Sequence, residues 1–540
     1  MATLTPYSNK SILILDDLPE MRSSLRSQVG SLGCERVAVS SNVKDALEQF
    51  KSNAFDVILC DYYLAGGTDG QQFLEFLRTR NIIGRGVLFV MITAEKNYES
   101  IVTAAECLPD DYLLKPFTAD VLKMRLERLL EKKQRLARVD QLQDKGDWVG
   151  VIAACDVIIA AKDRYLVDAM RIKGNALLMA GQAVEAIDFY QQVLTMRPLP
   201  WAKLGLARAL QKKGDATLSV AALSELIAES PRLMAAYDLL GKLHLELGNA
   251  DAALATLDSA RTISPNSLAR HRAIASVAEV QGDFQRVEQA LDQVVKKTRN
   301  SPLRETEDIA RLGNALTEMG EPAKAVTLLE EARKNFKEDA NNPLMAAVEA
   351  IAHQKAGNPE KAEAALERAM NGDLAKLPPA VVMTVAKACL SAGKQTAAQE
   401  IMKNLVQSNP ESTGLHAQIS TVLRDSGAGD VAETLVAESI REMIQLNNEA
   451  VVRARAGELA LAAEMLTEAA LRLPANMQVV SNAAAALLFD IWKNGLDPAK
   501  LGKAQMFQQA VMAQAPRHPK LAEIDELFSR IRSKYSPVQK

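Results

Sequence analysis

The sequence FDVILCDYY from Phe55 to Tyr63 is a run of mostly apolar residues in which an acid, Asp61, follows the apolar core. Such a run indicates a buried strand of a parallel sheet with a carboxylate at its carboxyl end. Three other apolar stretches end in polar residues of different kinds: Asp16 and Asp17 after SILIL, Thr93 after VLFVMI, and Lys115 after DYLL. Because parallel strands end at the same edge of a sheet, we expect these side chains to converge on one site.

This set of side chains predicts phosphoryl chemistry. Three neighbouring carboxylates repel one another, and a hard divalent cation such as Mg2+, which prefers oxygen ligands, would relieve the repulsion. The metal would also neutralise an incoming phosphoryl group, leaving one carboxylate to attack phosphorus while the hydroxyl and the ammonium hold its oxygens. The alternative is a flavodoxin-like sheet with scattered polar strand ends. The presence of all four strand-end types favours the functional interpretation.

Residues 10 to about 130 resemble the receiver domain of two-component response regulators, the chemotaxis-type fold. The residues that match the family are Asp16-Asp17, Asp61, Asp69-Gly70, Thr93-Ala94 and Lys115-Pro116-Phe117. The loop from Tyr62 to Gly70 departs from the family because it is longer than usual and lacks its proline.

The resemblance implies a role for each site residue. Asp61 would be the phosphoacceptor, and Mg2+ would be held by Asp61, by Asp17 directly, by Asp16 through water and by the backbone carbonyl of Tyr63. Thr93 and Lys115 would bind the phosphoryl oxygens, and Tyr112 occupies the position of the family's switch aromatic. Apart from the Mg2+-dependent phosphotransfer to Asp61 and self-dephosphorylation, no enzymatic activity is expected.

Apolar strands alternate with helical patterns between residues 10 and 117, which predicts a five-stranded parallel α/β sheet. The expected strands are 11–16, 35–39, 56–60, 87–92 and 110–114, and the expected helices are 19–32, 42–52, 70–80, 97–107 and 118 onward.

The last of these helices is expected to extend beyond the receiver. From Thr118 to Lys145 there is no glycine or proline, and apolar residues recur at helical spacing: Leu122, Leu126, Leu129, Leu130, Leu136, Val139 and Leu142. This pattern predicts a stiff helical connection rather than a flexible tether. The alternative is two helices with a break near Lys132-Lys133.

Three residue types recur in phase after this helix. Glycines stand at 146, 181, 214, 248, 282, 320, 357, 393, 427, 457 and 495. Alanine follows five residues later in seven of these eleven units, and proline follows seventeen residues later in five. We interpret each unit as a helical hairpin in which glycine ends one helix, alanine permits close packing and proline ends the second helix.

These units resemble tetratricopeptide repeats, most clearly from Met170 to Pro198 and from Tyr237 to Pro265. Another family of all-helical solenoid is the alternative. The expected domains are an N-terminal tail (1–9), the receiver (10–131), its last helix continuing as a linker (118–145), the repeats (146–499), and capping helices with a tail (500–540).

Composition limits the partners of the chain. Its 540 residues have a net charge of −3 and a pI near 6.1, which gives no electrostatic footprint for nucleic acid. No signal peptide or membrane-spanning stretch is visible, and the five cysteines are scattered, so a cytoplasmic protein without membrane insertion is expected.

Outside the receiver, no catalytic constellation is found in the sequence. The five histidines are expected to have packing or surface roles, none with an acid at metal-ligand spacing: His244, His271, His353, His416 and His518. Lys173–Asn175 and Arg311–Asn314 are weak candidates for a carboxylate-binding groove.

The expected function is therefore a response regulator whose output is protein binding. A histidine kinase or phosphotransfer protein would phosphorylate Asp61, the repeats would bind one or more proteins, and the receiver could form homodimers. The alternatives are a phosphate sink that drains phosphoryl groups from a kinase, and a constitutive scaffold.

Overall fold

The computed structural model describes residue 7 and residues 9–64, 69–94, 109–299, 301–336, 340–516 and 518–535. It contains two compact units, unit 1 from Met1 to Asp308 and unit 2 from Ile309 to Lys540. The helix expected over 97–107 lies outside the described residues.

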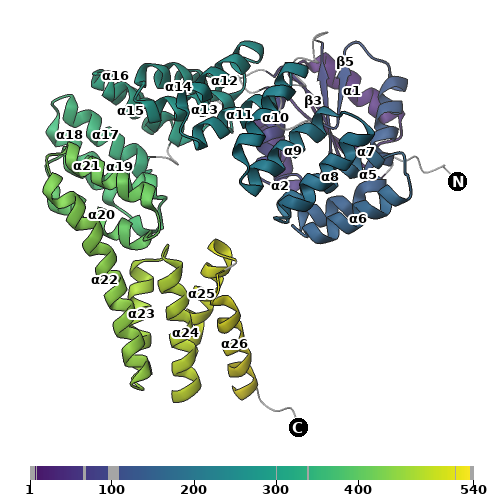
Figure 1. Ribbon diagram of the computed structural model, residues 1–540. Helices are drawn as coiled ribbons and strands as arrows, with labels where there is room; N and C mark the ends of the chain where they lie inside the picture. The colour runs from purple at the N-terminus through teal and green to yellow at the C-terminus, as the bar shows by residue number, and fades with distance from the viewer. Residues whose placement is uncertain are drawn as a thin grey trace. The chain divides into compact units, whose positions relative to one another are not determined.

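Unit 1 begins with a five-stranded parallel sheet (Figure 1). Its strands lie in the order β2-β1-β3-β4-β5. Its strands are β1 (Ser11–Leu15), β2 (Arg36–Ser40), β3 (Val57–Asp61), β4 (Leu88–Thr93) and β5 (Asp111–Leu114). β3 and β4 are buried at every residue because helices cover both faces of the sheet. The expected flavodoxin-like sheet is confirmed.

The two faces of the sheet are packed by different helices. These helices are α1 (Pro19–Ser31), α2 (Val43–Ser52), α3 (Gly70–Thr79) and α5 (Ala119–Asp144). Leu25 of α1 and Leu126 of α5 pack in one core with alternate residues of β1 and β3. Ala46 of α2 and Phe73 of α3 pack in the other core, on the opposite face.

Helix α5 continues without a break for 26 residues, including Lys132-Lys133. The Thr118 hydroxyl accepts a hydrogen bond from the Val121 N–H and caps the first turn. The first half of α5 contributes Leu122, Leu126 and Leu129 to the receiver core. Its second half contributes Val139 and Leu142 to the core of the first helical hairpins.

Helical hairpins fill the rest of both units. In unit 1 they are α6 (Trp148–Ala160), α7 (Leu166–Met179), α8 (Ala183–Met196), α9 (Pro200–Lys213), α10 (Ala216–Glu229), α11 (Met234–Glu246), α12 (Ala250–Ile263), α13 (Leu268–Gln281) and α14 (Phe284–Thr298). Unit 1 ends within α15 (Thr306–Glu318).

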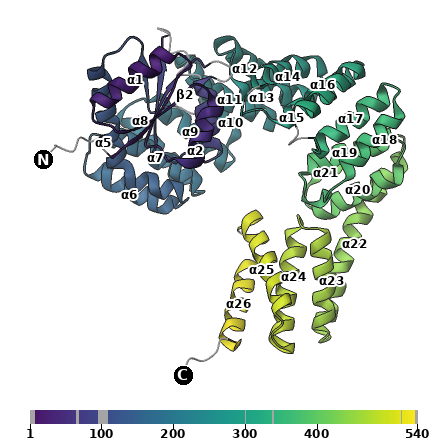
Figure 2. The same cartoon turned by 180° about the vertical axis from the view of Figure 1, so that it is seen from behind.

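Unit 2 continues the same pattern and includes a short 3-10 helix, η2. Its elements are α16 (Pro322–Asn335), α17 (Pro343–Lys355), α18 (Pro359–Met370), η2 (Leu374–Lys376), α19 (Pro379–Ser391), α20 (Gln395–Ser408), α21 (Thr413–Asp425), α22 (Gly429–Arg455), α23 (Leu459–Arg472), α24 (Met477–Asn494), α25 (Pro498–Gln514) and α26 (Leu521–Tyr535). Within this unit, α22, α23 and α24 stand side by side (Figure 2).

The recurring residues have the positions that the pattern predicts. All eleven repeat glycines have positive φ, between 70° and 113°, a region that residues with a Cβ rarely adopt. The alanines five residues later are all buried, from Ala186 to Ala462. Each of the five prolines stands two residues beyond the end of a helix, as Pro198 follows α8. No helix in the described part of the chain is both long and apolar enough to cross a bilayer.

Candidate functional site

The carboxyl edge of the sheet brings the predicted site residues together. Asp16 directly follows β1, Asp61 ends β3, Thr93 ends β4 and Lys115 directly follows β5. Asp16, Asp61 and Thr93 are buried, at 0%, 7% and 1% exposure. The apolar strands that precede these residues therefore position polar side chains in an enclosed site.

Lys115 connects two of the acids. Its Nζ lies 3.0 Å from Asp16 Oδ2 and 3.2 Å from Asp61 Oδ2, and its side chain is largely buried. The Lys115 backbone N–H also donates to the Thr93 carbonyl at 2.8 Å, so the ends of β4 and β5 are joined at this edge.

The two oxygens of the Asp61 carboxylate have different partners. Oδ1 accepts a hydrogen bond from the Tyr62 N–H at 2.9 Å, and Oδ2 faces Lys115. Burial raises the pKa of Asp61, the Lys115 ammonium opposes this rise, and the neighbouring Asp16 carboxylate adds to it. The acid is thus in a site where negative charge is in excess.

Three carboxylates form a group suited to a hard cation. Oxygen atoms of Asp16, Asp17 and Asp61 all lie within 4.8 Å of one another. One ammonium, that of Lys115, does not balance three carboxylates, and a divalent ion with oxygen ligands would supply the missing positive charge. The residues present therefore fit Mg2+.

Two residues that sequence reasoning did not assign to the site help to shape it. Arg22 Nη1 donates to the backbone carbonyls of Asp16 at 2.7 Å and Asp17 at 2.9 Å, which fixes the loop after β1. A Cβ on Gly70 would lie 2.4 Å from the Asp61 carbonyl oxygen, so only glycine lets α3 begin this close to β3. The sequence signal for Arg22 is a basic residue in the helix that follows the two acids.

The two tyrosines expected at the site differ in exposure. Tyr63, two residues beyond Asp61, is 57% exposed and meets the Tyr62 ring edge-on, with centroids 4.9 Å apart. Tyr112 of β5 is half-buried and packs against the core that contains Phe89. The part of the loop at residues 65–68 lies outside the described residues.

Comparison with known proteins identifies the fold that holds this site. The model of the response regulator receiver domain matches residues 12–127. The chemotaxis protein CheY of Pseudomonas aeruginosa is 32% identical over 121 residues, which are 22% of this chain and 96% of the relative. The chain belongs to the response-regulator family. This response regulator also matches a tetratricopeptide repeat model over residues 204–267.

Two solved structures are similar to separate parts of the response regulator. A tetratricopeptide repeat protein from Parabacteroides merdae is 15% identical, with 48% of this chain and 98% of that chain covered and a TM-score of 0.31. The response regulator protein TrrA from Thermotoga maritima, in complex with Mg2+ and BeF, is 26% identical, with 22% and 99% covered and a TM-score of 0.20.

The expectation that no histidine has an acid at metal-ligand spacing is wrong for His353. Glu349 precedes it by one helical turn in α17, Glu330 of α16 lies beside them, and the ligand atoms of all three lie within 4.8 Å of one another. Basic side chains already neutralise these acids: Arg368 is 3.0 Å and Arg333 3.5 Å from Glu349, and Lys361 is 3.7 Å from Glu330. This surplus of positive charge does not favour a metal ion.

The first of the two candidate carboxylate-binding segments already has an internal partner. Lys173 Nζ lies 2.6 Å from Asp156 and 5.0 Å from the centre of the Phe189 ring. Its ammonium is therefore neutralised within the repeats, and the second segment begins at Arg311 in α15, on another hairpin.

Proposed function

We propose that this response regulator is a phosphorylation-controlled adaptor of the cytoplasm, with Asp61 as phosphoacceptor and the repeats as the protein-binding output. The observation that carries the proposal is that one unbroken helix, α5, belongs to both the receiver core and the first repeat core. A change at the receiver can then reach the repeats through a rigid element rather than through a flexible linker.

The acid group of the site supports the transfer step. An Asp61 oxygen attacks phosphorus, and the bond from phosphorus to the histidine nitrogen of the donor protein breaks, which leaves an aspartyl phosphate and a free histidine. Mg2+, held by Asp16, Asp17, Asp61 and the Tyr63 carbonyl, would supply positive charge for the phosphoryl oxygens. Lys115 and the Thr93 hydroxyl would bind those oxygens, and Tyr112 would change position with them.

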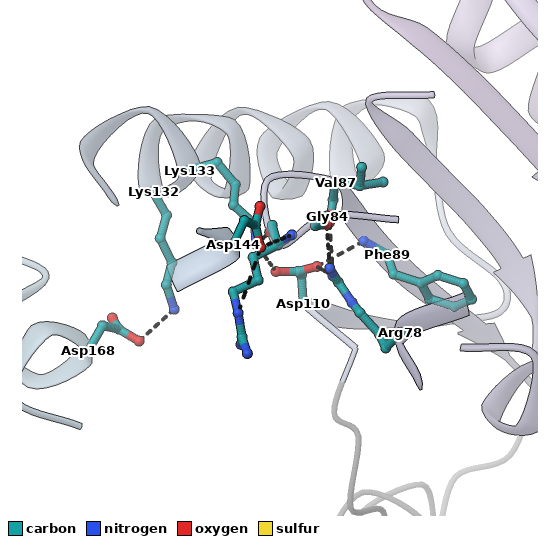
Figure 3. Close-up of polar contacts among 10 residues, drawn as sticks. Arg78, Gly84, Val87, Phe89, Asp110, Lys132, Lys133, Asp144 and Asp168 are labelled. Carbon is teal, nitrogen blue, oxygen red and sulfur yellow. Dashed lines mark hydrogen bonds and ion pairs between the residues drawn. The ribbon is translucent and has the colours of Figure 1, made fainter. Parts of the chain in front are cut away.

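Strand β5 connects this site to α5. Lys115 follows the carboxyl end of β5, whereas Asp110 and Asp111 stand at its beginning. Asp110 accepts from the Phe89 N–H at 2.9 Å and forms an ion pair with Lys133 of α5 at 2.9 Å, both side chains being mostly buried (Figure 3). Asp111 pairs with Arg125 of α5 at 3.2 Å. A displacement of Lys115 towards a phosphoryl group would therefore act on a strand that is bound to α5 at its other end.

The adjoining residues of α5 contact the repeats. Lys132 forms an ion pair with Asp168 of α7 at 2.6 Å (Figure 3), and Glu131 accepts from Arg164 at 3.0 Å. Three consecutive residues of α5, from Glu131 to Lys133, thus bind elements on both sides of the junction. We propose that phosphorylation acts through this junction and changes the surface that the repeats expose to partner proteins.

Intact-protein mass spectrometry tests the first step. The full chain, treated with a small phosphodonor and Mg2+, should gain the mass of one phosphoryl group, and Asp61→Ala should gain none. A wild-type chain that gains no phosphoryl group would exclude the phosphoacceptor role. A group that is gained and lost within minutes, with no partner bound in either state, would instead indicate a phosphate sink.

A further inference from the structure

A second site is suggested by a groove beside α5, at the edge of the sheet where the strands begin. Its volume is about 710 Å3, which is within the range of small-molecule sites. Five acids line it: Asp56, Glu127, Glu131, Asp140 and Asp144. The site of phosphorylation is at the opposite edge of the sheet, so this groove is separate from it.

The groove has a surplus of negative charge. The two lysines that line it already have partners, since Lys10 lies 3.0 Å from Asp56 and Lys133 lies 2.9 Å from Asp110. Of the remaining acids, Glu131 pairs with Arg164 at 3.0 Å, and Asp144 lies 3.9 Å from Arg85.

Asp140 is the unusual residue of the groove. The residue is 8% exposed, and its Oδ2 is enclosed without a hydrogen-bond partner among the described residues. Burial raises the pKa of Asp140; Lys133 opposes the rise, and Asp144 and Asp110 add to it. A buried carboxylate without a partner lowers stability, so a ligand that pairs with it would be bound favourably.

We propose that this groove binds an organic polycation of the polyamine class, with Asp140 as its buried anchor. The acids of α5 are spread from Glu127 to Asp144, about 25 Å along a helix axis, which suits positive charges carried on an extended chain. A metal ion needs ligand atoms that converge on one point. In the described part of the chain two groups of acids and histidine meet this condition, and both lie outside the groove. The groove is also too large for a single ion.

Bound polycation would strengthen the junction of α5 with the receiver. It would lie between α5 and the beginnings of β1, β3 and β4, next to the Lys133–Asp110 ion pair. The proposal does not depend on phosphorylation of Asp61, and its test uses unphosphorylated protein.

Binding of spermidine to the full chain, measured by isothermal titration calorimetry, tests the proposal. Wild type should bind spermidine, and Asp140→Asn should bind it at least about tenfold more weakly, since it loses a charge-assisted hydrogen bond. Without ligand, Asp140→Asn should unfold at the same or a higher temperature than wild type, because it keeps the shape and removes the unpaired charge. Asp188→Asn, an exposed change on α8, should bind spermidine like wild type.

Three results would overturn the proposal. The first is that wild type does not bind spermidine. The second is that Asp140→Asn, shown to be folded by circular dichroism, binds it with wild-type affinity. The third is that Mg2+ or Ca2+, at the same concentration as spermidine, displaces it completely by binding at Asp140. That result would make the groove a metal site.

Discussion

Replacing Gln134 and Arg135 of α5 with glycine should weaken the connection between the receiver and the repeats without removing a core contact. Both side chains are exposed, between the half of α5 that packs on the receiver and the half that packs on the repeats. Each glycine costs about 0.7 kcal/mol of helix stability relative to glutamine or arginine, so the pair costs about 1.4 kcal/mol. An open form of α5 at this point becomes about tenfold more populated.

Hydrogen exchange of α6 and α7 measures the consequence. In wild type, phosphodonor and Mg2+ should change the exchange of these helices, and in the double-glycine variant this change should be smaller while Asp61 still gains a phosphoryl group. Gln134→Ala with Arg135→Ala is the matched control, because it removes the same side chains and keeps the helix. An unchanged response in the double-glycine variant would refute the role of α5 as a rigid connection.

Two further changes test local packing and pH dependence. Gly70→Ala should destabilise the chain by about 1–3 kcal/mol in urea unfolding, because its Cβ would lie 2.4 Å from the Asp61 carbonyl oxygen, whereas Gly30→Ala, with no atom within 4 Å, should not. The pKa of His353 is lowered, mainly by burial. Glu349 and Glu330 oppose this shift, and Lys361 and Arg368 add to it. Below a pH of about 6.5 the unfolded chain therefore takes up a proton that the folded chain does not, and stability should fall on acidification. His353→Gln should reduce that fall and His416→Gln should not; equal falls in both variants would contradict this assignment.

The receiver fold could be predicted because its strands are apolar runs with polar ends. The runs before Asp16, Asp61 and Thr93 have too few polar residues to be surface strands, and parallel topology then requires their ends to meet. The position of the Lys115 ammonium between Asp16 and Asp61 could not be predicted, because it depends on side-chain distances across the sheet. The role of Arg22 could not be predicted from its position after the two acids alone, because its contacts are with backbone carbonyls rather than with the acid side chains.

The repeats differ in how their second helix ends. Where proline stands seventeen residues after the glycine, the second helix ends two residues earlier, as at Pro198 and Pro474. After Gly427 the same position is Ile444, and α22, a helix of 27 residues from Gly429 to Arg455, continues through it. The irregular interval of 30 residues between Gly427 and Gly457 thus reflects two helices joined into one.

Buried charged groups were the least predictable feature. His353 and Glu349 are one turn apart in sequence, but Glu330 joins them only because α16 packs against α17. In the sequence, Asp140 has the pattern of a surface acid on a long helix. In the structure the receiver lies beside it, and the residue is buried. Burial of such groups depends on tertiary packing rather than on local pattern.

The most direct test of a phosphorylation-controlled adaptor is a comparison of bound proteins in the two states of the receiver. The full chain, treated with phosphodonor and Mg2+, and the Asp61→Ala variant would each be used for affinity capture from native cell extract, followed by quantitative mass spectrometry. The account predicts at least one partner that is enriched with only one of the two proteins and that binds through the repeats. Identical sets of partners, with wild type fully phosphorylated, would contradict it.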